Sequence, residues 1–317
     1  MPVKLRPVTA SVSTCTERCD RRQDGRAMII DAHQHLWRIG QNGCSWPTPD
    51  LVAIHRDFEI EDLALAAKPL GVSGTVLVQS QSNDRDTDWL LQTAEQSDLV
   101  KAVVGWVDLR SPAAPRRIAE LAGHPKMRGL RPMLQELAED DWILDRALDP
   151  AIETMKAHRL SFDALVFPRH LEHICVFAAR HPELRIVIDH AAKPPIASGA
   201  LEPWRSAIAR AAALTNIWCK LSGLLTEAAP TQGCDALRPV AAHLMDIFAP
   251  ERLMWGSDWP VLHLAGDYAG WFEMTWELCG TRDEASQRAL FAATACQFYR
   301  IFEGVSAGEG PRDVMAR

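Results

Sequence analysis

Short apolar segments alternate with longer amphipathic segments along most of this chain. The apolar segments are rich in β-branched residues on both faces, which is typical of parallel strands that are covered on both sides. Eight such strands are predicted, at residues 29–33, 75–79, 102–107, 129–131, 162–166, 185–189, 217–221 and 253–257. Helical patterns occupy most of the gaps, at residues 86–97, 115–121, 150–158, 170–181, 204–214, 237–248 and 284–302.

This repetition of eight strand–helix units in about 275 residues predicts an α/β fold, a (β/α)8 TIM barrel. An open doubly wound sheet is the alternative. Neither G-x-G-x-x-G nor G-x-x-x-x-G-K-[ST] follows the first strand, so the sequence does not support a nucleotide-binding sheet. The barrel domain is expected to span residues 28–303. Residues 1–27 are polar and basic and are expected to be a disordered or non-native extension, and residues 304–317 a flexible tail.

The composition narrows the range of partners. The 317 residues include 34 lysines and arginines against 41 aspartates and glutamates, a net charge of −7. This charge argues against nucleic acid or an anionic membrane as the main partner, because both require concentrated positive charge. The longest apolar runs fall far short of the ~20 residues that span a bilayer. The eight cysteines form no C-x-x-C pair, and no secretory signal precedes them, which favours free thiols in the cytoplasm.

Ionisable residues gather where three predicted strands end, the edge at which barrel enzymes carry their chemistry. The first strand leads into His33 and His35, whose i, i+2 spacing on a strand directs both side chains to one side. The sixth strand leads into His190 and the eighth into Asp258. Each residue alone is equally compatible with a capping role in a loop. Together they are the side chains needed to activate a water molecule.

Three segments carry a resemblance to a known group of enzymes. They are IDAHQHLW (30–37), IDHAAKPPI (188–196) and LMWGSDWPV (253–261). GLRPMLQ (129–135) is a fourth segment, and residues 84–91 are a weaker fifth. The chain resembles the amidohydrolase superfamily over about residues 28–302. Within it, the chain is similar to lactone hydrolases, which include sugar lactonases and the sulfomuconolactone and pyrone-dicarboxylate hydrolases.

The resemblance implies a role for each matching residue. His33 and His35 correspond to the histidine pair of the family, and His190 to its strand-six histidine. Asp258 corresponds to the strand-eight aspartate, the expected general base. Arg131 corresponds to an arginine that contacts substrate. His190 is expected to act as general acid or base, because imidazole titrates near neutral pH.

The chain departs from the family members that hold two metal ions. Those members use a lysine or glutamate on strand four and a histidine on strand five, whereas here strand four ends at Arg131. Strand five ends without a histidine, and His170 follows three residues after Phe167. We therefore expect either no required cofactor or one divalent metal, zinc. Three protein ligands suit a catalytic zinc, and the candidates are His33, His35 and Asp258.

Further residues near the strand ends are expected to bind substrate. The complete predicted set is His33, His35, Arg131, Gln79, Trp46 and Lys193. Trp46 lies in a loop rich in glycine and proline, whereas Trp37 and Trp259 are expected in the core. Lys220 lies within the seventh strand, and its sequence position leaves open whether it faces the mouth of the barrel or an outward slot.

The function predicted from these residues is hydrolysis of a small lactone, most simply a sugar lactone in carbohydrate catabolism. Such a carboxylic-ester hydrolase would use Asp258 to activate water and His190 to protonate the leaving alkoxide. The alternatives are a dicarboxylated lactone hydrolase of aromatic catabolism, a decarboxylase of the same superfamily and a non-catalytic binding protein. A homo-oligomer is compatible with the sequence.

Overall fold

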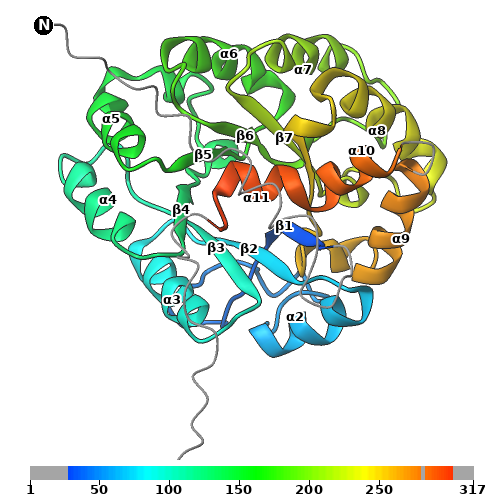
Figure 1. Ribbon diagram of the computed structural model, residues 1–317, viewed down its shortest axis with the longest axis horizontal. Helices are drawn as coiled ribbons and strands as arrows, with labels where there is room; N and C mark the ends of the chain where they lie inside the picture. The colour runs from blue at the N-terminus through cyan, green and yellow to red at the C-terminus, as the bar shows by residue number, and fades with distance from the viewer. Residues whose placement is uncertain (1–27, 280–282, 303–317) are drawn as a thin grey trace, which may run out of the picture.

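The computed structural model describes residues 28–279 and 283–302, and it confirms the predicted barrel (Figure 1). Neighbouring strands are parallel and follow chain order from β1 to β8. The strands are β1 (Ile30–Gln34), β2 (Gly74–Val78), β3 (Val100–Gly105), β4 (Met127–Leu130), β5 (Ser161–Ala164), β6 (Ile186–Ile188), β7 (Ile217–Leu221) and β8 (Leu253–Trp255). A parallel bridge between Gln34 and Trp259 brings β8 back to β1.

Several strands end earlier than the sequence pattern predicts. β4 ends at Leu130, β6 at Ile188 and β8 at Trp255, so Arg131, His190 and Asp258 all lie just beyond the hydrogen-bonded ladder. Two of these, His190 and Asp258, have positive φ angles of 51° and 58°, which a strand cannot contain. The polar residues therefore begin the loops at the carboxyl edge of the barrel.

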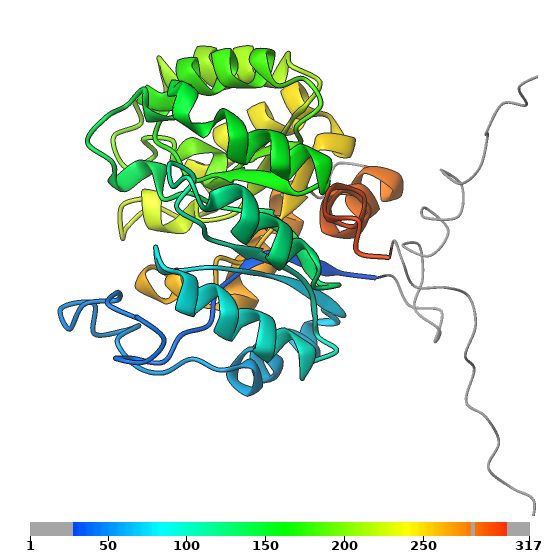
Figure 2. The same ribbon diagram turned by 90° about the vertical axis from the view of Figure 1, so that its left-hand side faces the viewer.

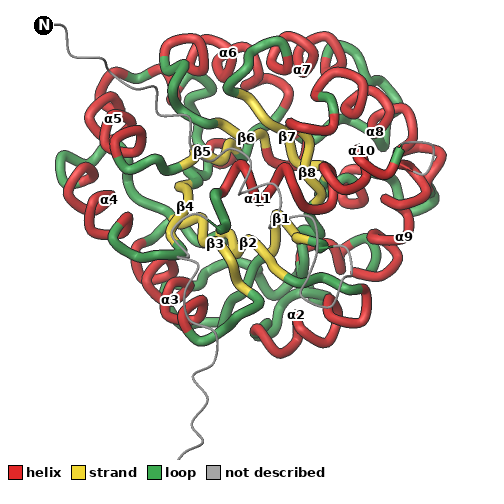
Figure 3. Tube along the Cα trace, in the orientation of Figure 1, coloured by secondary structure: helices red, strands yellow, loops and turns green. Residues whose placement is uncertain are grey.

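Most helices surround the strands, and one lies across the end of the barrel, as the tube trace in Figure 3 shows. They are α2 (Ile60–Ala67), α3 (Asp84–Glu95), α4 (Ala114–Ala122), α5 (Asp149–Ala157), α6 (Leu171–Arg180), α7 (Trp204–Ala212), α8 (Cys234–Phe248), α9 (Tyr268–Cys279), α10 (Glu284–Arg288) and α11 (Thr294–Tyr299). α2 and α9 occupy gaps for which the pattern gave no helix. The long helix predicted at 284–302 is instead α10 and α11 joined by a π-helical turn at Ala289–Ala293.

The amino end of the barrel is closed by α11, which lies opposite the long loop after β1 (Figure 2). Arg185, just before β6, donates hydrogen bonds to the carbonyls of Gln297 and Phe298 in α11. A separate apolar cluster fills the barrel beneath this helix, and its members include Ile30, Val76, Ala102, Val187, Met254, Phe298 and Tyr299. The amino end of the barrel is therefore filled by packed side chains, and an active site can form only at the carboxyl end.

The structure tests part of the remaining sequence predictions, which concern the domain bounds, the cysteines and membrane-spanning helices. The barrel accounts for the described residues, whereas the predictions for residues 1–27 and 304–317 concern parts of the chain outside them. The cysteines at 44, 175, 219 and 234 are free thiols, as predicted. Within 28–279 and 283–302, no helix combines the length and apolar character that a bilayer crossing demands.

Candidate active site

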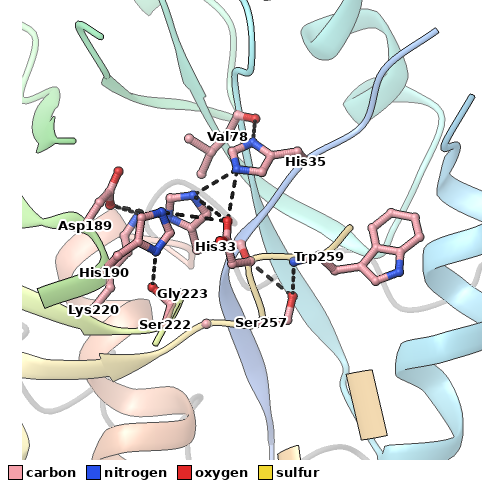
Figure 4. A network of polar contacts seen from close by, with 12 residues as sticks. His33, His35, Val78, Asp189, His190, Lys220, Ser222, Gly223, Ser257 and Trp259 are labelled. Atoms are coloured by element: carbon pink, nitrogen blue, oxygen red, sulfur yellow. Dashed lines mark hydrogen bonds and ion pairs between the residues drawn. The ribbon is translucent and has the colours of Figure 1, made fainter. Parts of the chain in front are cut away.

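Four of the predicted residues converge at the carboxyl end of the barrel, and Figure 4 labels three of them, His33, His35 and His190. Nε2 of His33 lies 3.1 Å from Nε2 of His35. Oδ1 of Asp258 lies 3.4 Å from Nε2 of His35 and 3.7 Å from Nε2 of His33. The same oxygen lies 3.7 Å from Nε2 of His190. One carboxylate oxygen is thus surrounded by three imidazoles, all of them buried.

The first and eighth strand ends are tied together by the carboxylate of Asp31. It accepts hydrogen bonds from the backbone N–H of Ser257 at 2.8 Å and of His33 at 3.1 Å. The hydroxyls of Ser257 and Tyr268 donate to its other oxygen, at 2.6 and 2.9 Å. The register of β1 shifts between Asp31 and Gln34 where this tether forms. Burial raises the pKa of Asp31 to about 6 despite these donors.

His190 enters the site from a left-handed turn. Residues 190–193 have φ angles of 51°, 51°, 59° and 52°, and none of them is glycine. Left-handed helical backbone costs L-residues roughly 1–2 kcal/mol each, so the fold holds this turn at a cost. The indole N–H of Trp204 donates to the carbonyl of Ala191 at 2.8 Å. Gly223 leaves room for the imidazole, because a Cβ there would lie 2.5 Å from Nδ1 of His190.

Burial sets the charge state of the site. It lowers the pKa of His190 to about 4, and it also lowers the pKa values of His33 and His35. Burial alone would raise the pKa of Asp258, but the neighbouring imidazoles, His190 foremost, hold that pKa below its usual range. At neutral pH the centre is therefore an ionised carboxylate among uncharged imidazoles. Nδ1 of His190 lies 2.9 Å from the hydroxyl of Ser222, which orients the ring.

An ionic layer lies between the site and the closed end, and it comprises Lys220, Asp163, Asp189 and Tyr299. Nζ of Lys220 lies 2.8 Å from Oδ2 of Asp163 and 3.0 Å from Oδ1 of Asp189. It also lies 3.2 Å from Nδ1 of His33, and the hydroxyl of Tyr299 donates to Asp163 at 2.5 Å. Lys220 therefore faces the barrel interior, which resolves the alternative left open by its sequence position. The sequence reasoning did not identify Asp163 or Tyr299.

Arg131 is held at the edge of this centre. Its guanidinium donates to the carbonyl of Gln79 and lies 3.5 Å from Oδ2 of Asp189 and 3.4 Å from Nε2 of His33. The side-chain amide of Gln79 donates in return to the carbonyl of Arg131 at 2.7 Å. Gln79 is fully buried behind Arg131, so the structure gives it a supporting position, and its contact with substrate stays a prediction.

A pocket with about 600 Å³ of empty space opens above the centre. Predicted residues that line it are His35, Trp46, Arg131, His190, Lys193 and Asp258. Neither His33 nor Gln79 is among its lining residues, because both are fully buried. Trp37 and Trp259 are buried in the core, as predicted. Ser80, Gln135, Glu136 and Thr226 also line the pocket, and the sequence reasoning missed them because isolated polar residues in loops give no periodic signal.

The arrangement of ligand atoms fits one divalent metal. One possible donor atom each from His33, His35 and Asp258 lies within 4.8 Å of the others. Ligands around tetrahedral zinc, with Zn–N of about 2.1 Å, are roughly 3.4 Å apart, close to the separations found here. Nδ1 of His35 lies 2.8 Å from the carbonyl of Val78, so this nitrogen carries the proton and Nε2 offers its lone pair. His170 instead lies 3.1 Å from Asp140, outside the metal-competent groups of the described chain.

The fold and the site define a class: a barrel hydrolase with its histidines and aspartate at the ends of strands one, six and eight. Comparison with known proteins agrees. The chain belongs to the amidohydrolase family, whose model matches residues 30–301. It is 51% identical over 276 residues to an L-fucono-1,5-lactonase of Burkholderia ambifaria, a match that covers 86% of this chain and 95% of that protein. An L-fucono-1,5-lactonase of Burkholderia multivorans is 37% identical over 295 residues, covering 89% and 99%.

A solved structure supports the architecture. An amidohydrolase from Burkholderia multivorans with bound zinc superposes with a TM-score of 0.81 at 35% sequence identity. The match covers 86% of this chain and 99% of the other. The prediction of an amidohydrolase-type (β/α)8 barrel is therefore confirmed.

Proposed function

We propose that this protein is a sugar lactonase, with L-fucono-1,5-lactone as the first substrate to test. The observation that carries this proposal is the 51% identity to the Burkholderia ambifaria lactonase over nearly the whole of that protein. The predicted lactone chemistry agrees with it, because the pocket offers a carboxylate base beside a fixed cation. Ring opening yields the corresponding hydroxy acid.

Asp258 is the general base in this proposal. Its carboxylate is ionised at neutral pH because its pKa lies below the usual range, so it can accept a proton from water. The water oxygen then bonds to the lactone carbonyl carbon, and the carbonyl electrons move to oxygen. Collapse of this intermediate breaks the ring C–O bond, and the alkoxide receives the proton from Asp258. His190, uncharged at neutral pH, supplies a hydrogen bond and not an imidazolium proton.

Arg131 is suited to stabilise the oxyanion. Its guanidinium is permanently charged, only 3% exposed and part of the pocket lining. Preorganised donors of this kind act strongly where water is excluded, and loss of one such donor typically costs ~3–4 kcal/mol of transition-state stabilisation. The partners Gln79 and Asp189 hold the guanidinium in place before substrate arrives.

One divalent metal, zinc by its donor set, would be held by His33, His35 and Asp258. When bound, it would polarise the lactone carbonyl as a Lewis acid. His35 keeps its Nε2 lone pair available through the contact with Val78, and His33 is oriented by Lys220 and Asp189. The family is typically metal-dependent. Metal analysis of the purified protein before and after chelation tests whether this protein also binds a metal ion.

The pocket favours an uncharged substrate over a dicarboxylate. The charge of Arg131 is partly balanced by Asp189, and Glu136 adds negative charge to the lining. Lys193 remains as a cation, with its Nζ 5.3 Å from the centre of the Phe167 ring. A cytoplasmic location, a homo-oligomeric state and a small-molecule lactone as sole partner stay predictions.

A pH-indicator assay of ring opening tests the proposal. The panel contains L-fucono-1,5-lactone, other aldonolactones and a pyrone dicarboxylate, with the spontaneous rate subtracted and with zinc or a chelator added. We expect hydrolysis of the sugar lactones well above the spontaneous rate. Activity on the dicarboxylate alone would move the protein to the alternative lactone class. Folded protein that opens no lactone under any condition would contradict the proposal.

A further inference from the structure

A buried glutamine, Gln81, holds the backbone on the Trp46 side of the pocket. No sequence motif predicted a role for this residue. Gln81 follows β2 and is only 3% exposed. Its side-chain oxygen accepts from the backbone N–H of Ser45 at 3.0 Å and of Trp46 at 3.3 Å. Its side-chain nitrogen donates to the carbonyl of Trp46 at 2.7 Å. One amide therefore satisfies both backbone polar groups of the residue that lines the pocket.

Asn83, two residues after Gln81, holds the loop that carries Trp46 at a second point. The side-chain amide of Asn83 donates to the carbonyl of Gly43 at 3.2 Å, while its oxygen caps the start of α3. The indole of Trp46 also packs edge-on against the buried Trp37, with ring centroids 5.4 Å apart. Trp46 is thus fixed by its backbone on one side and by its ring on the other.

Gln81 also contacts the pocket rim directly. Its side-chain nitrogen donates to the hydroxyl of Ser80 at 2.9 Å, and Ser80 lines the same pocket as Trp46. Gln81 itself is not a lining residue. Any influence on substrate must therefore pass through these neighbours, chiefly Trp46.

We propose that Gln81 is a positioning residue that fixes Trp46 as a wall of the substrate pocket, where the indole packs on the C–H face of the lactone ring. This inference rests on the proposed lactonase function for its kinetic test. A flat aromatic wall favours a polyhydroxylated ring with one apolar face over a flexible acyclic ester. The wall binds substrate and transition state alike, so its loss affects KM more than kcat.

A double-mutant cycle tests the dependence of one residue on the other. Trp46→Ala and Gln81→Ala are each expected to raise KM for L-fucono-1,5-lactone about 10-fold, with kcat within about twofold of wild type. If Gln81 acts through Trp46, the double variant also shows an increase of about 10-fold. An increase of about 100-fold, or an unchanged KM for Gln81→Ala, overturns the inference. Gln92→Ala, on an exposed face of α3, is the matched control and keeps wild-type kinetics.

Hydrogen exchange measured without substrate separates this inference from the proposed function. Peptides that contain residues 43–46 should exchange faster in Gln81→Ala than in wild type or Gln92→Ala, because Ser45 and Trp46 lose their acceptor. Unchanged exchange there overturns the tether even if the enzyme is a lactonase. Faster exchange in a protein that opens no lactone supports the tether and rejects the proposed function.

A second variant, with a side chain of nearly the same size, covers the case in which Gln81→Ala does not fold. Gln81→Glu keeps the acceptor for the two N–H groups but loses the donor to the Trp46 carbonyl. Its KM and its exchange rate should exceed those of wild type, because a carboxylate oxygen then faces the Trp46 carbonyl. Values equal to wild type in both measurements would contradict the role of the glutamine amide.

Discussion

The two ends of the barrel are built from the same eight strands but are stabilised in opposite ways. At the closed end, α11 covers an apolar cluster, and Arg185 ties the helix down. At the mouth, three imidazoles and a carboxylate are buried together, and residues 190–193 adopt left-handed backbone. Burial of apolar side chains stabilises the fold, whereas burial of ionisable groups costs free energy. The closed end thus supports a mouth whose arrangement is strained.

The ionic layer is where these two ends meet. Lys220 contacts His33 of the mouth, and Asp163 accepts from Tyr299 of the closed end. Burial raises the pKa of Asp163, while Lys220 holds the pKa of Asp189 well below its usual range despite burial. The layer therefore connects the packed end to His33 at the mouth. Three substitutions measure how much each region contributes to the free energy of unfolding. One lies in this layer, one at the mouth and one at the closed end.

Lys220→Met should produce the largest loss of stability. It removes the cation and leaves two buried carboxylates without their partner, which typically costs about 3–5 kcal/mol. Urea unfolding followed by circular dichroism measures the change in the free energy of unfolding. Lys68→Met, on the surface, is the matched control with little effect. A Lys220→Met protein as stable as wild type would show that the ionic layer does not join the two ends.

Asp86 tests the cost of burial near the mouth. Burial raises its pKa from an ordinary 3.8 to about 7, although the backbone N–H groups of Ser80 and Gln81 donate to it. Because the folded pKa is raised, this group's contribution is complete below pH ~4 and is lost as the pH rises through about 7.

Asp86→Asn removes this titration. Relative to the variant, wild type should lose on the order of 3 kcal/mol of unfolding free energy between pH 4 and pH 8. Chemical unfolding of both proteins across that range measures the difference. A difference that stays constant with pH would mean that Asp86 is not forced towards its neutral form.

Tyr299→Phe tests how much one hydrogen bond at the closed end contributes to stability, and its expected effect is the smallest of the three. The variant keeps the ring in its apolar cluster and removes only the hydroxyl that donates to Asp163. A hydrogen bond to a charged group contributes about 1.5–3 kcal/mol, so we expect a loss of about 2 kcal/mol. Thermal unfolding measures it. Equal melting temperatures for Tyr299→Phe and wild type would assign the attachment of α11 to apolar packing alone.

The sequence predicted the barrel well because its signal is local. Continuous apolar strands and amphipathic helices repeat eight times, and the ionisable residues that interrupt this pattern mark the ends of the strands. His33, His35, His190 and Asp258 were identified in this way, and the structure brings them together. The expectation of a sugar lactonase agrees with the lactonase relatives.

What the sequence could not predict depends on contacts between distant residues. The inward orientation of Lys220 is fixed by Asp163 and Asp189, which lie on two other strands or just beyond them. Gln79 follows a strand end as a substrate contact would, yet it turns to the backbone of Arg131. Gln81 has no pattern at all, because its partner is a backbone segment 35 residues away.

Asp258→Asn, compared with wild type on L-fucono-1,5-lactone, tests the central claim most directly. The exposed Asp267→Asn provides the same chemical change away from the site. Loss of a general base should lower kcat by about 10²–10⁴-fold, while the circular dichroism spectrum stays that of the folded wild type. If instead a folded Asp258→Asn protein opens the lactone within about tenfold of the wild-type rate, the carboxylate among the three imidazoles is not the catalytic base.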